Sequence, residues 1–364
     1  MKAMVLSAPK APPQVEDVVL ADPAAQEVLV KLHAVGVCHT DLHVLRGELP
    51  MPVPIVLGHE GAGVVERVGS AVTSVKPGDH VILWVMAACG KCRECQKGKP
   101  YLCKVGRDAI FAGTLLDGTT RLRRRNNEAI HHFFSQSAFA EYAVVPERSA
   151  VKIRPDAPLD KVALLGCGTT TGIGAIVKAA RVEPGAQVAV FGCGGVGLSA
   201  VMAARMVAAG KIIAVDIADG KLELATAFGA THRINAARQD PVDAIRRLTG
   251  GGADYAFEFI GNTAVMEQAY ESTAPGGATF IIGGAPAGGK VSLDALSLLF
   301  DKSVHGVSGG NVLPQVDIPL LVDLFMDGIL PLERLVSRTY RLEQLNQAFR
   351  AMEEGDVARS VIVL

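Results

Sequence analysis

Apolar residues change their spacing near residue 160, and this change predicts two kinds of structure. Before it, short stretches rich in valine and other β-branched residues are separated by turn signals such as Lys-Pro-Gly-Asp at 76–79. Residues 28–32, 63–68 and 80–83 are the clearest strands. Because turns recur between short strands, this part of the chain is predicted to form an antiparallel β domain or partial barrel.

After residue 160, apolar runs alternate with amphipathic segments. Such alternation predicts a parallel sheet with right-handed crossover helices. The expected strands are residues 187–191, 211–215, 255–258 and 279–282, and the expected helices are 196–209 and 221–228.

Length and charge limit the possible partners. A chain of 364 residues has room for two domains. Its net charge of −1 argues against nucleic acid or an anionic membrane as partner, because both require a basic excess. The one basic run, residues 121–125, is expected to be a solvated loop.

The beginning of the sequence lacks the apolar segment of a signal peptide, and no apolar run approaches the roughly 20 residues that span a bilayer. A cytoplasmic protein is therefore expected. In a reducing compartment, clustered cysteines favour metal ions over disulfides.

The sequence Gly-Cys-Gly-Gly-Val-Gly at 192–197 lies between a predicted strand and a predicted helix, the context in which a glycine-rich turn binds a pyrophosphate. Asp216 ends the next strand, where a carboxylate binds ribose hydroxyls and repels a 2′-phosphate, so NAD is favoured over NADP. The alternative is a glycine turn in which Asp216 caps a helix. The expected contacts are Gly192, Gly194, Gly195, Val196, Gly197 and Asp216.

Six of the seven cysteines fall into two sets that suit zinc. Four lie within residues 89–103 in a double C-x-x-C pattern, and four thiolates make a closed structural site. Cys38, Cys167 and the intervening His59 would leave one coordination position open for chemistry. Taken singly, by spacing alone, His59 would be interpreted as a core histidine and Cys167 as an inert buried thiol. Glu60 is a natural carboxylate beside that metal. The structural set is Cys89, Cys92, Cys95 and Cys103.

These motifs resemble the medium-chain zinc-dependent alcohol dehydrogenases over essentially the whole chain. The pattern Gly-His-Glu-x-x-Gly-(five)-Gly-x-x-Val from residue 58 is similar to the zinc signature of the family, and the four-cysteine segment and glycine loop follow in the same order. Residues 116–142 resemble the longer dimeric branch, which includes class I and class III enzymes.

The resemblance implies an α/β protein with a GroES-like, β-rich catalytic domain and a Rossmann domain with a doubly wound parallel sheet. The catalytic domain would comprise residues 1–168 and 309–364, with a structural zinc lobe at 86–104. Residues 169–308 would form the NAD-binding domain. The implied protein is a cytoplasmic homodimer that binds NAD and two zinc ions per chain, together with a small alcohol or aldehyde.

The resemblance also implies roles for single residues. Cys38, His59 and Cys167 would bind the catalytic zinc, with Glu60 beside it. Thr40 would bind the substrate hydroxyl, and His43 would pass its proton to solvent. Other implied coenzyme contacts are His39, Thr171, Lys221, Ile282 and Arg359.

The implied substrate pocket contains Leu49, Val85, Phe133 and Phe134. Val85 replaces an aromatic residue common in the family, so we expect a wider apolar cleft that favours aromatic, allylic or medium-chain primary alcohols over ethanol. Arg107 lies where class III enzymes bind the glutathione adduct of formaldehyde. An S-(hydroxymethyl)glutathione dehydrogenase is therefore an alternative, and a non-catalytic dinucleotide-binding protein is a more distant one.

Overall fold

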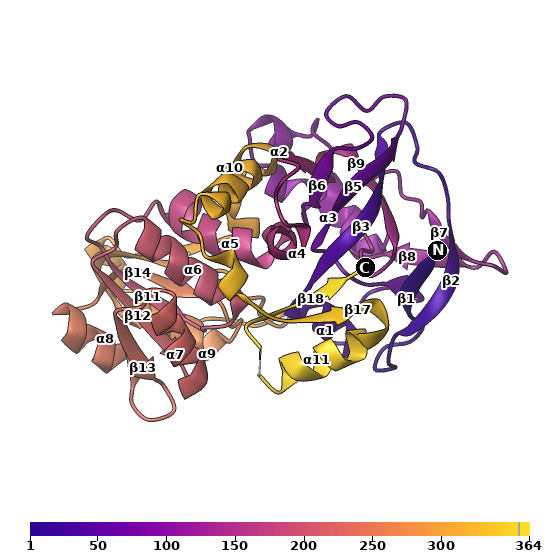
Figure 1. Ribbon diagram of the computed structural model, residues 1–364. Helices are drawn as coiled ribbons and strands as arrows, with labels where there is room; N and C mark the ends of the chain where they lie inside the picture. The colour runs from indigo at the N-terminus through magenta and orange to yellow at the C-terminus, as the bar shows by residue number, and fades with distance from the viewer. Residues whose placement is uncertain (356) are drawn as a thin grey trace. The chain divides into compact units, whose positions relative to one another are not determined.

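The computed structural model describes residues 1–355 and 357–364 (Figure 1). Its contacts divide the chain into two compact units. The first comprises Met1–Cys167 and Leu313–Leu364, and the second is Gly168–Val312. The predicted domain limits, 168/169 and 308/309, lie close to these junctions. That the two parts are independent folding domains stays a prediction.

The first unit contains the predicted β-rich structure. Five strands close into a barrel in the order β1-β2-β7-β8-β4, and a seven-stranded sheet has the order β10-β6-β5-β3-β18-β17, with β9 also paired to β3. The strands are β1 Lys2–Leu6, β2 Gln14–Leu20, β3 Glu27–Val37, β4 Ile55–Val56, β5 Gly61–Val68, β6 His80–Leu83, β7 Leu122–Arg124, β8 Ala129–His132, β9 Tyr142–Pro146, β10 Ala150–Ile153, β17 Val336–Arg341 and β18 Arg359–Val363.

Two segments far apart in the sequence build this sheet together. β18 pairs antiparallel with β3, with Ser360 opposite Val37 and Val363 opposite Ala34, and the yellow and indigo arrows lie side by side in Figure 1. Most of β3 is buried, because its side chains contribute to a core that also contains Ile362 and Phe139. The segment that ends at Cys38 is thus fixed from both sides.

Short helices complete the first unit. They connect strands or cover the sheet, and several of them begin at the candidate site residues discussed below. They are α1 His39–Leu45, α2 Arg93–Gln96, α3 Lys104–Ala112, α4 Leu159–Val162, α10 Pro314–Met326 and α11 Leu345–Glu353, with 3₁₀ turns η1 Pro100–Leu102, η2 Glu147–Ser149, η3 Ala163–Gly166, η7 Leu332–Arg334 and η8 Leu342–Gln344.

The second unit is the predicted parallel sheet. Its strand order is β13-β12-β11-β14-β15-β16, with parallel pairing throughout, so the winding direction reverses between β11 and β14. Ligands of such sheets bind at the carboxyl ends of the strands beside this switch point. The strands are β11 Gln187–Phe191, β12 Lys211–Asp216, β13 His232–Asn235, β14 Ala253–Glu258, β15 Thr273–Ile281 and β16 Ser303–Gly306.

Helices connect these strands. The predicted helix 196–209 ends earlier, at Met206, because Ala208 adopts a left-handed conformation (φ 59°). The helices and turns of this unit are α5 Gly168–Gly174, η4 Ala175–Ala180, α6 Gly195–Met206, α7 Asp219–Ala227, α8 Pro241–Thr249, α9 Thr263–Glu271, η5 Ser297–Phe300 and η6 Gly309–Asn311.

The prediction that the basic run 121–125 is a solvated loop is wrong for part of it. The Arg121 side chain is only 11% exposed, and its guanidinium lies 2.8 Å from a carboxylate oxygen of Glu27. Arg124, in β7, forms a similar pair with Glu16 at 2.8 Å. Arg121 and Arg124 therefore form ion pairs with carboxylates distant in sequence, although the local charge pattern predicts that they are solvated.

Among the residues that the structure describes, no single helix is long and apolar enough to cross a membrane. One bent pair, Leu159–Gly166 with Gly168–Ala180, passes the test of length and composition only when taken together.

Candidate metal centres and coenzyme site

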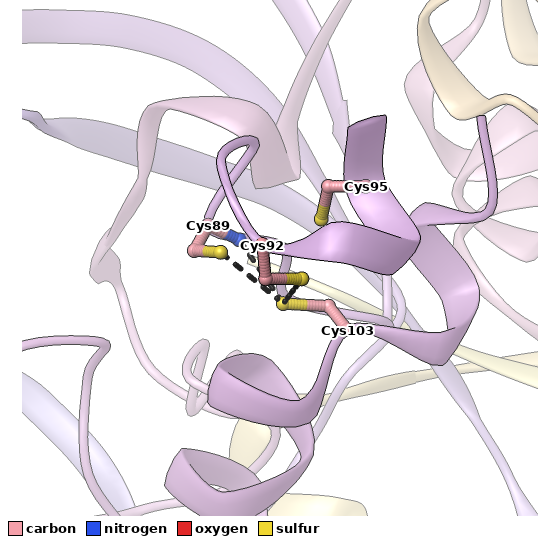
Figure 2. Close-up of side chains that lie close together, drawn as sticks. All are labelled: Cys89, Cys92, Cys95 and Cys103. Atoms are coloured by element: carbon pink, nitrogen blue, oxygen red, sulfur yellow. Dashed lines mark hydrogen bonds between the residues drawn. The ribbon is translucent and has the colours of Figure 1, made fainter. Parts of the chain in front are cut away.

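The four clustered cysteines converge on one point (Figure 2). Their sulfur atoms all lie within 4.8 Å of one another. Cys103 lies 3.6 Å from Cys89 and 3.8 Å from Cys92 by sulfur–sulfur distance, and its thiol also accepts a hydrogen bond from the Gly106 N–H. Cys92 and Cys103 cap the first turns of α2 and α3. Two short helices thus deliver thiols to the tetrathiolate site that the sequence predicts.

The pKa values of two of these thiols shift in opposite directions. A hydrogen bond from the Cys95 backbone, assisted by neighbouring thiols, lowers the pKa of Cys92 to about 6. Burial, together with the adjacent Cys92, raises the pKa of Cys95 to about 12. Four thiolates can lie this close only when a cation compensates their charge, which is the function of zinc in a closed site.

The second predicted set also comes together. The donor atoms of Cys38, His59, Glu60 and Cys167 all lie within 4.8 Å of one another. Cys38 ends the β3 segment and caps α1, His59 and Glu60 precede β5, and Cys167 follows η3. Two sulfurs, one imidazole nitrogen and a carboxylate are donors that zinc accepts.

Two observations show that this set fits a metal ion. His59 is fully buried and its Nε2 has no hydrogen-bond partner, although a buried polar atom normally has one. A hydrogen bond from Cys167 lowers the pKa of Cys38, while the Cys38 sulfur raises the pKa of Cys167, so the pair favours one thiolate. A metal ion would give Nε2 a partner and allow the second thiol to ionise.

Asp41 is a site residue that the sequence analysis missed. It is fully buried, and its Oδ1 lies 3.2 Å from His59 Nδ1 and 2.9 Å from the Gly58 nitrogen, while Oδ2 accepts from the Cys38 N–H at 3.1 Å. A carboxylate on Nδ1 fixes the ring so that Nε2 faces a metal. The available signal was its position three residues after Cys38, the spacing of a capping box.

Glu60 forms a buried ion pair with Arg359, a contact that the sequence analysis did not anticipate. Both side chains are buried, and Gly36 is needed beneath them, because a Cβ there would overlap the Glu60 carboxylate. Burial raises the pKa of Glu60, although the Arg359 charge opposes the shift. The expected contact of Arg359 with coenzyme phosphates stays a prediction.

The predicted proton path lies on α1. The Cys38 sulfur is 3.6 Å from the Thr40 hydroxyl, so Thr40 lies at the metal cluster. His39 and His43 are exposed. His43 Nδ1 lies 2.5 Å from an Oε2 of Glu48, a partner that the sequence analysis did not identify. The His43 imidazole is therefore in direct contact with solvent and with the Glu48 carboxylate.

Two of the predicted pocket residues contact the candidate metal site. The ring of Phe134 stacks on His59 with centroids 5.0 Å apart, and Phe133 meets the same imidazole edge-on at 5.3 Å. Phe133 is fully buried, whereas Phe134 is partly exposed. Val85 is buried, and its backbone N–H donates to Gly166, which precedes the ligand Cys167.

Leu49 and Arg107 are less closely tied to this cluster. Leu49 is partly buried, and its N–H donates to the carbonyl of His43. Arg107 belongs to α3 in the four-cysteine segment, where its side chain is 62% exposed and lies 3.6 Å from Asp108. The structure therefore gives Arg107 a surface partner, Asp108, within the four-cysteine segment.

The predicted dinucleotide turn joins β11 to α6 in the second unit. Gly192 has a φ of 92°, and a Cβ on Gly197 would overlap the Gly192 carbonyl, so both glycines are required by geometry. A Cβ on Gly194 would meet nothing within 4 Å, which leaves open space above the turn. Gly195 and Val196 begin α6, whose N-terminus suits a pyrophosphate.

Asp216 lies beside this turn at the end of β12. Its carboxylate accepts hydrogen bonds from the backbone N–H groups of Cys193, Ile217 and Ala218 at 2.8, 2.8 and 3.1 Å. It therefore shapes the turn, and its expected contact with a ribose stays a prediction. Burial raises the pKa of Cys193 to about 12, in agreement with a buried turn residue outside both metal sets.

The remaining predicted coenzyme residues lie in the same unit, Thr171 on α5, Lys221 on α7 and Ile282 directly after β15. The Ile282 N–H donates to the backbone carbonyl of Glu258. The Glu258 carboxylate was missed: it is buried at the end of β14 and accepts from the Ile260 and Gly261 N–H groups at 2.8 and 2.7 Å. A polar residue ending an otherwise apolar strand was the available signal.

Comparisons with known proteins identify the family of this chain. The family model of the alcohol dehydrogenase GroES-like domain matches residues 24–155, and that of the zinc-binding dehydrogenases matches 195–327. An S-(hydroxymethyl)glutathione dehydrogenase from Escherichia coli O1:K1 / APEC is 45% identical over 365 residues, which cover 99% of either chain.

Two solved structures are also similar. An alcohol dehydrogenase zinc-binding domain protein from Burkholderia ambifaria has a TM-score of 0.97 and 44% identity, covering 100% of this chain and 98% of that one. Benzyl alcohol dehydrogenase from Acinetobacter calcoaceticus has a TM-score of 0.95 and 38% identity, with 100% and 99% covered. The predicted fold class, a GroES-like domain with a Rossmann domain, is confirmed, and the predicted cofactors, zinc and NAD, are those of this family. The chain therefore belongs to the zinc-dependent medium-chain alcohol dehydrogenases.

Proposed function

We propose that this protein is an NAD-dependent dehydrogenase that interconverts primary alcohols and aldehydes, with a preference for aromatic, allylic or medium-chain alcohols. The observation that carries the proposal is the cluster of Cys38, His59 and Cys167 beside the Thr40 hydroxyl and the Phe134 ring. When bound there, zinc supplies Lewis-acid activation of an alcohol oxygen, and NAD serves as hydride acceptor.

The side chains of the cluster have separate roles in binding. Cys38, Cys167 and Nε2 of His59 would hold the metal, and Asp41 orients the imidazole. Glu60 is kept in an ion pair with Arg359, so the buried carboxylate is compensated and does not add an unpaired charge to two thiolates.

Thr40 and His43 would move the substrate proton. Thr40 Oγ1 lies at the cluster and is placed to accept a proton from an alcohol hydroxyl, and His43, one helical turn later, is exposed and bonded to Glu48. Among the described contacts no hydrogen bond joins Thr40 to His43. The relay therefore needs a bridging group that can both accept and donate a proton.

Apolar walls support the choice of substrate class. Phe133 and Phe134 place aromatic surface against His59, and Val85 is small and buried. Aromatic and allylic groups gain from such surface, whereas ethanol is too short to bury comparable area. The similar benzyl alcohol dehydrogenase structure gives the same direction.

A second candidate is S-(hydroxymethyl)glutathione, because relatives that carry this name are 45% identical over nearly the whole chain. The glutathione adduct carries carboxylates, which an arginine can bind in a bidentate manner. Arg107 is exposed and available for this, although Asp108 beside it would compete. We rank this substrate second.

For the coenzyme, we propose NAD rather than NADP. The Asp216 carboxylate would meet a 2′-phosphate with like charge, and its neighbours Ile217 and Ala218 supply no cation. His39, Thr171, Lys221, Ile282 and Arg359 remain proposed contacts of this coenzyme. We also propose that residues 1–168 with 309–364, and residues 169–308, are the two domains.

We propose a cytoplasmic homodimer, formed through the second unit. Leu296, Leu299 and Phe300 are 64%, 80% and 58% exposed, and they directly precede β16, an edge strand of the six-stranded sheet among the described strands. An exposed apolar patch beside an open strand edge suits pairing with a second copy. Thiolate ligands are also best preserved in a reducing compartment.

A substrate screen tests the proposed activity. NAD reduction is measured with ethanol, octanol, benzyl alcohol, cinnamyl alcohol and S-(hydroxymethyl)glutathione. We expect kcat/KM to be highest for the benzylic and allylic alcohols. Activity confined to the glutathione adduct, and lost in an Arg107→Ala variant, would instead establish the second candidate.

A further inference from the structure

The loop of residues 133–137 has an unusual backbone. Phe134, Ser135 and Ser137 have φ values of 50°, 53° and 61°, a left-handed region that side chains other than glycine rarely adopt. Such residues persist only where surrounding contacts determine their conformation, and they concentrate at functional sites. The contacts that hold this loop therefore indicate what it is held for.

Ser137 provides a central contact. Its hydroxyl accepts from the Phe133 N–H at 3.0 Å and donates to the Val56 carbonyl at 2.8 Å, and the side chain is only 2% exposed. One hydroxyl thus closes the loop on itself and fixes it to the strand that leads to His59. Without this hydroxyl, the buried Phe133 N–H and Val56 carbonyl would each lose a hydrogen-bond partner.

The same strand is bound to the loop beyond Ser137. Ala138 donates its N–H to the Gly58 carbonyl at 2.9 Å, and Phe139 donates to Leu57 at 3.0 Å. The backbone directly before His59 is therefore paired with the backbone directly after the loop. A shift of one would move the other.

The loop brings two aromatic rings onto the face and edge of His59. Phe134 stacks at 5.0 Å, Phe133 approaches edge-on at 5.3 Å, and the two phenylalanine rings meet at 4.7 Å. Asp41 fixes the imidazole through Nδ1 only. Rotation about that hydrogen bond is therefore limited by the rings, whose place depends on the loop.

We propose that Ser137 is a positioning residue: by holding the 133–137 loop, its hydroxyl fixes the plane of the His59 imidazole and the Phe134 wall of the substrate site. The role of Ser137 in the Phe134 wall rests on the proposed function. Its role at the His59 imidazole concerns the metal site alone and can be tested without turnover.

The experiment compares Ser137→Ala with Ser137→Gly and with a matched control, Ser135→Ala. Glycine removes the hydroxyl but tolerates the left-handed φ, so this variant keeps the test informative if Ser137→Ala folds poorly. Ser135 has the same type of backbone and is fully buried, but its hydroxyl donates to the Thr114 carbonyl, away from the His59 strand.

The first readout is the visible spectrum of the cobalt-substituted protein together with the rate of metal loss to a chelator. The four-cysteine site is unchanged in all variants, so differences report the His59 cluster. We expect shifted cobalt bands and about tenfold faster metal loss in both Ser137 variants, and wild-type values for Ser135→Ala.

The second readout is the kinetics with benzyl alcohol. We expect KM to rise about tenfold with a smaller change in kcat, since a displaced Phe134 weakens binding before it affects chemistry. Cobalt bands and metal loss equal to wild type in both Ser137 variants overturn the proposal. Shifted bands in a protein that oxidises no alcohol would instead remove the proposed function and retain the positioning role.

Discussion

Oδ1 of Asp41 lies 3.2 Å from Nδ1 of His59, and both side chains are fully buried. The same carboxylate accepts N–H groups from Cys38 and Gly58. One acidic side chain therefore binds the two segments that carry the candidate metal ligands Cys38 and His59, and it contacts the imidazole at Nδ1, which leaves Nε2 for a metal ion.

An Asp41→Asn variant should bind zinc at this cluster about 10- to 100-fold more weakly. The amide keeps the shape but turns one of its two polar atoms into a donor that faces a backbone N–H. Zinc affinity is measured by competition with a chelator. Asp323→Asn, an exposed acid that pairs with Arg154, is the control. Equal affinity in both variants would exclude the orienting role.

Replacement of Arg359 by methionine should lower the free energy of unfolding by about 3–5 kcal/mol, because it removes the guanidinium charge that compensates the buried Glu60 carboxylate. Adding Glu60→Gln should recover much of that loss. Denaturant titration of both variants measures the effect. Arg46→Met provides the comparison, since its pair with Glu353 is exposed and should contribute less than about 1 kcal/mol.

The buried His132 predicts acid sensitivity. Burial lowers its pKa to about 3, whereas an unfolded histidine titrates near 6.5. Between these values the unfolded chain binds a proton that the folded chain does not, so stability falls as pH decreases, by roughly 1.4 kcal/mol per pH unit below about pH 6.

His132→Gln should reduce this acid dependence by one proton, because glutamine does not titrate. The fold should be kept, since the amide oxygen can still accept the Arg121 backbone N–H that His132 Nε2 binds. Unfolding free energies between pH 4 and pH 7 give the slope. His131→Gln, at the partly exposed neighbouring position, is the matched control for the substitution itself. Identical slopes in wild type and His132→Gln would contradict the assignment.

Asp216→Gly should raise kcat/KM for NADP relative to NAD by tenfold or so, since it removes the charge that opposes a 2′-phosphate. It should also weaken binding of both coenzymes, because the Cys193 and Ala218 N–H groups lose their acceptor. Asp216→Asn keeps an acceptor and separates the two effects. An unchanged preference in both variants would argue against ribose recognition.

Leu299→Glu should dissociate the proposed dimer, because it places a charge in the most exposed part of the apolar patch. Sedimentation velocity gives the mass. Val316→Glu, on the exposed face of α10 in the first unit, is the control and should stay dimeric. A monomeric wild-type protein would reject the proposal outright.

Local patterns predicted much of the fold. The expected strands 80–83 and 187–191 coincide with β6 and β11, because burial of a short apolar run between turn residues needs no distant information. The glycine turn was found in the same way. Helix α6 was predicted too long, since nothing in the sequence indicates the left-handed conformation of Ala208, two residues after the helix ends.

Contacts between residues far apart in the sequence could not be predicted from local sequence patterns. The partners of Glu60 and Arg121 lie 299 and 94 residues away, and no periodicity relates such positions. Asp41 differs, because its spacing from Cys38 was visible and only its target was not. The stacking of Phe133 and Phe134 on His59 likewise depends on a loop conformation that these residues do not favour on their own.

The pairing of β18 with β3 also has a consequence for biosynthesis. Translation delivers β3, His59 and Glu60 long before Arg359, because the continuous segment Gly168–Val312 lies between them in the sequence. During that interval Glu60 has not yet formed its ion pair with Arg359. Until β18 is added, residues 34–37 of β3 lack their strand partner on that side, and an unpaired strand edge of this kind favours aggregation.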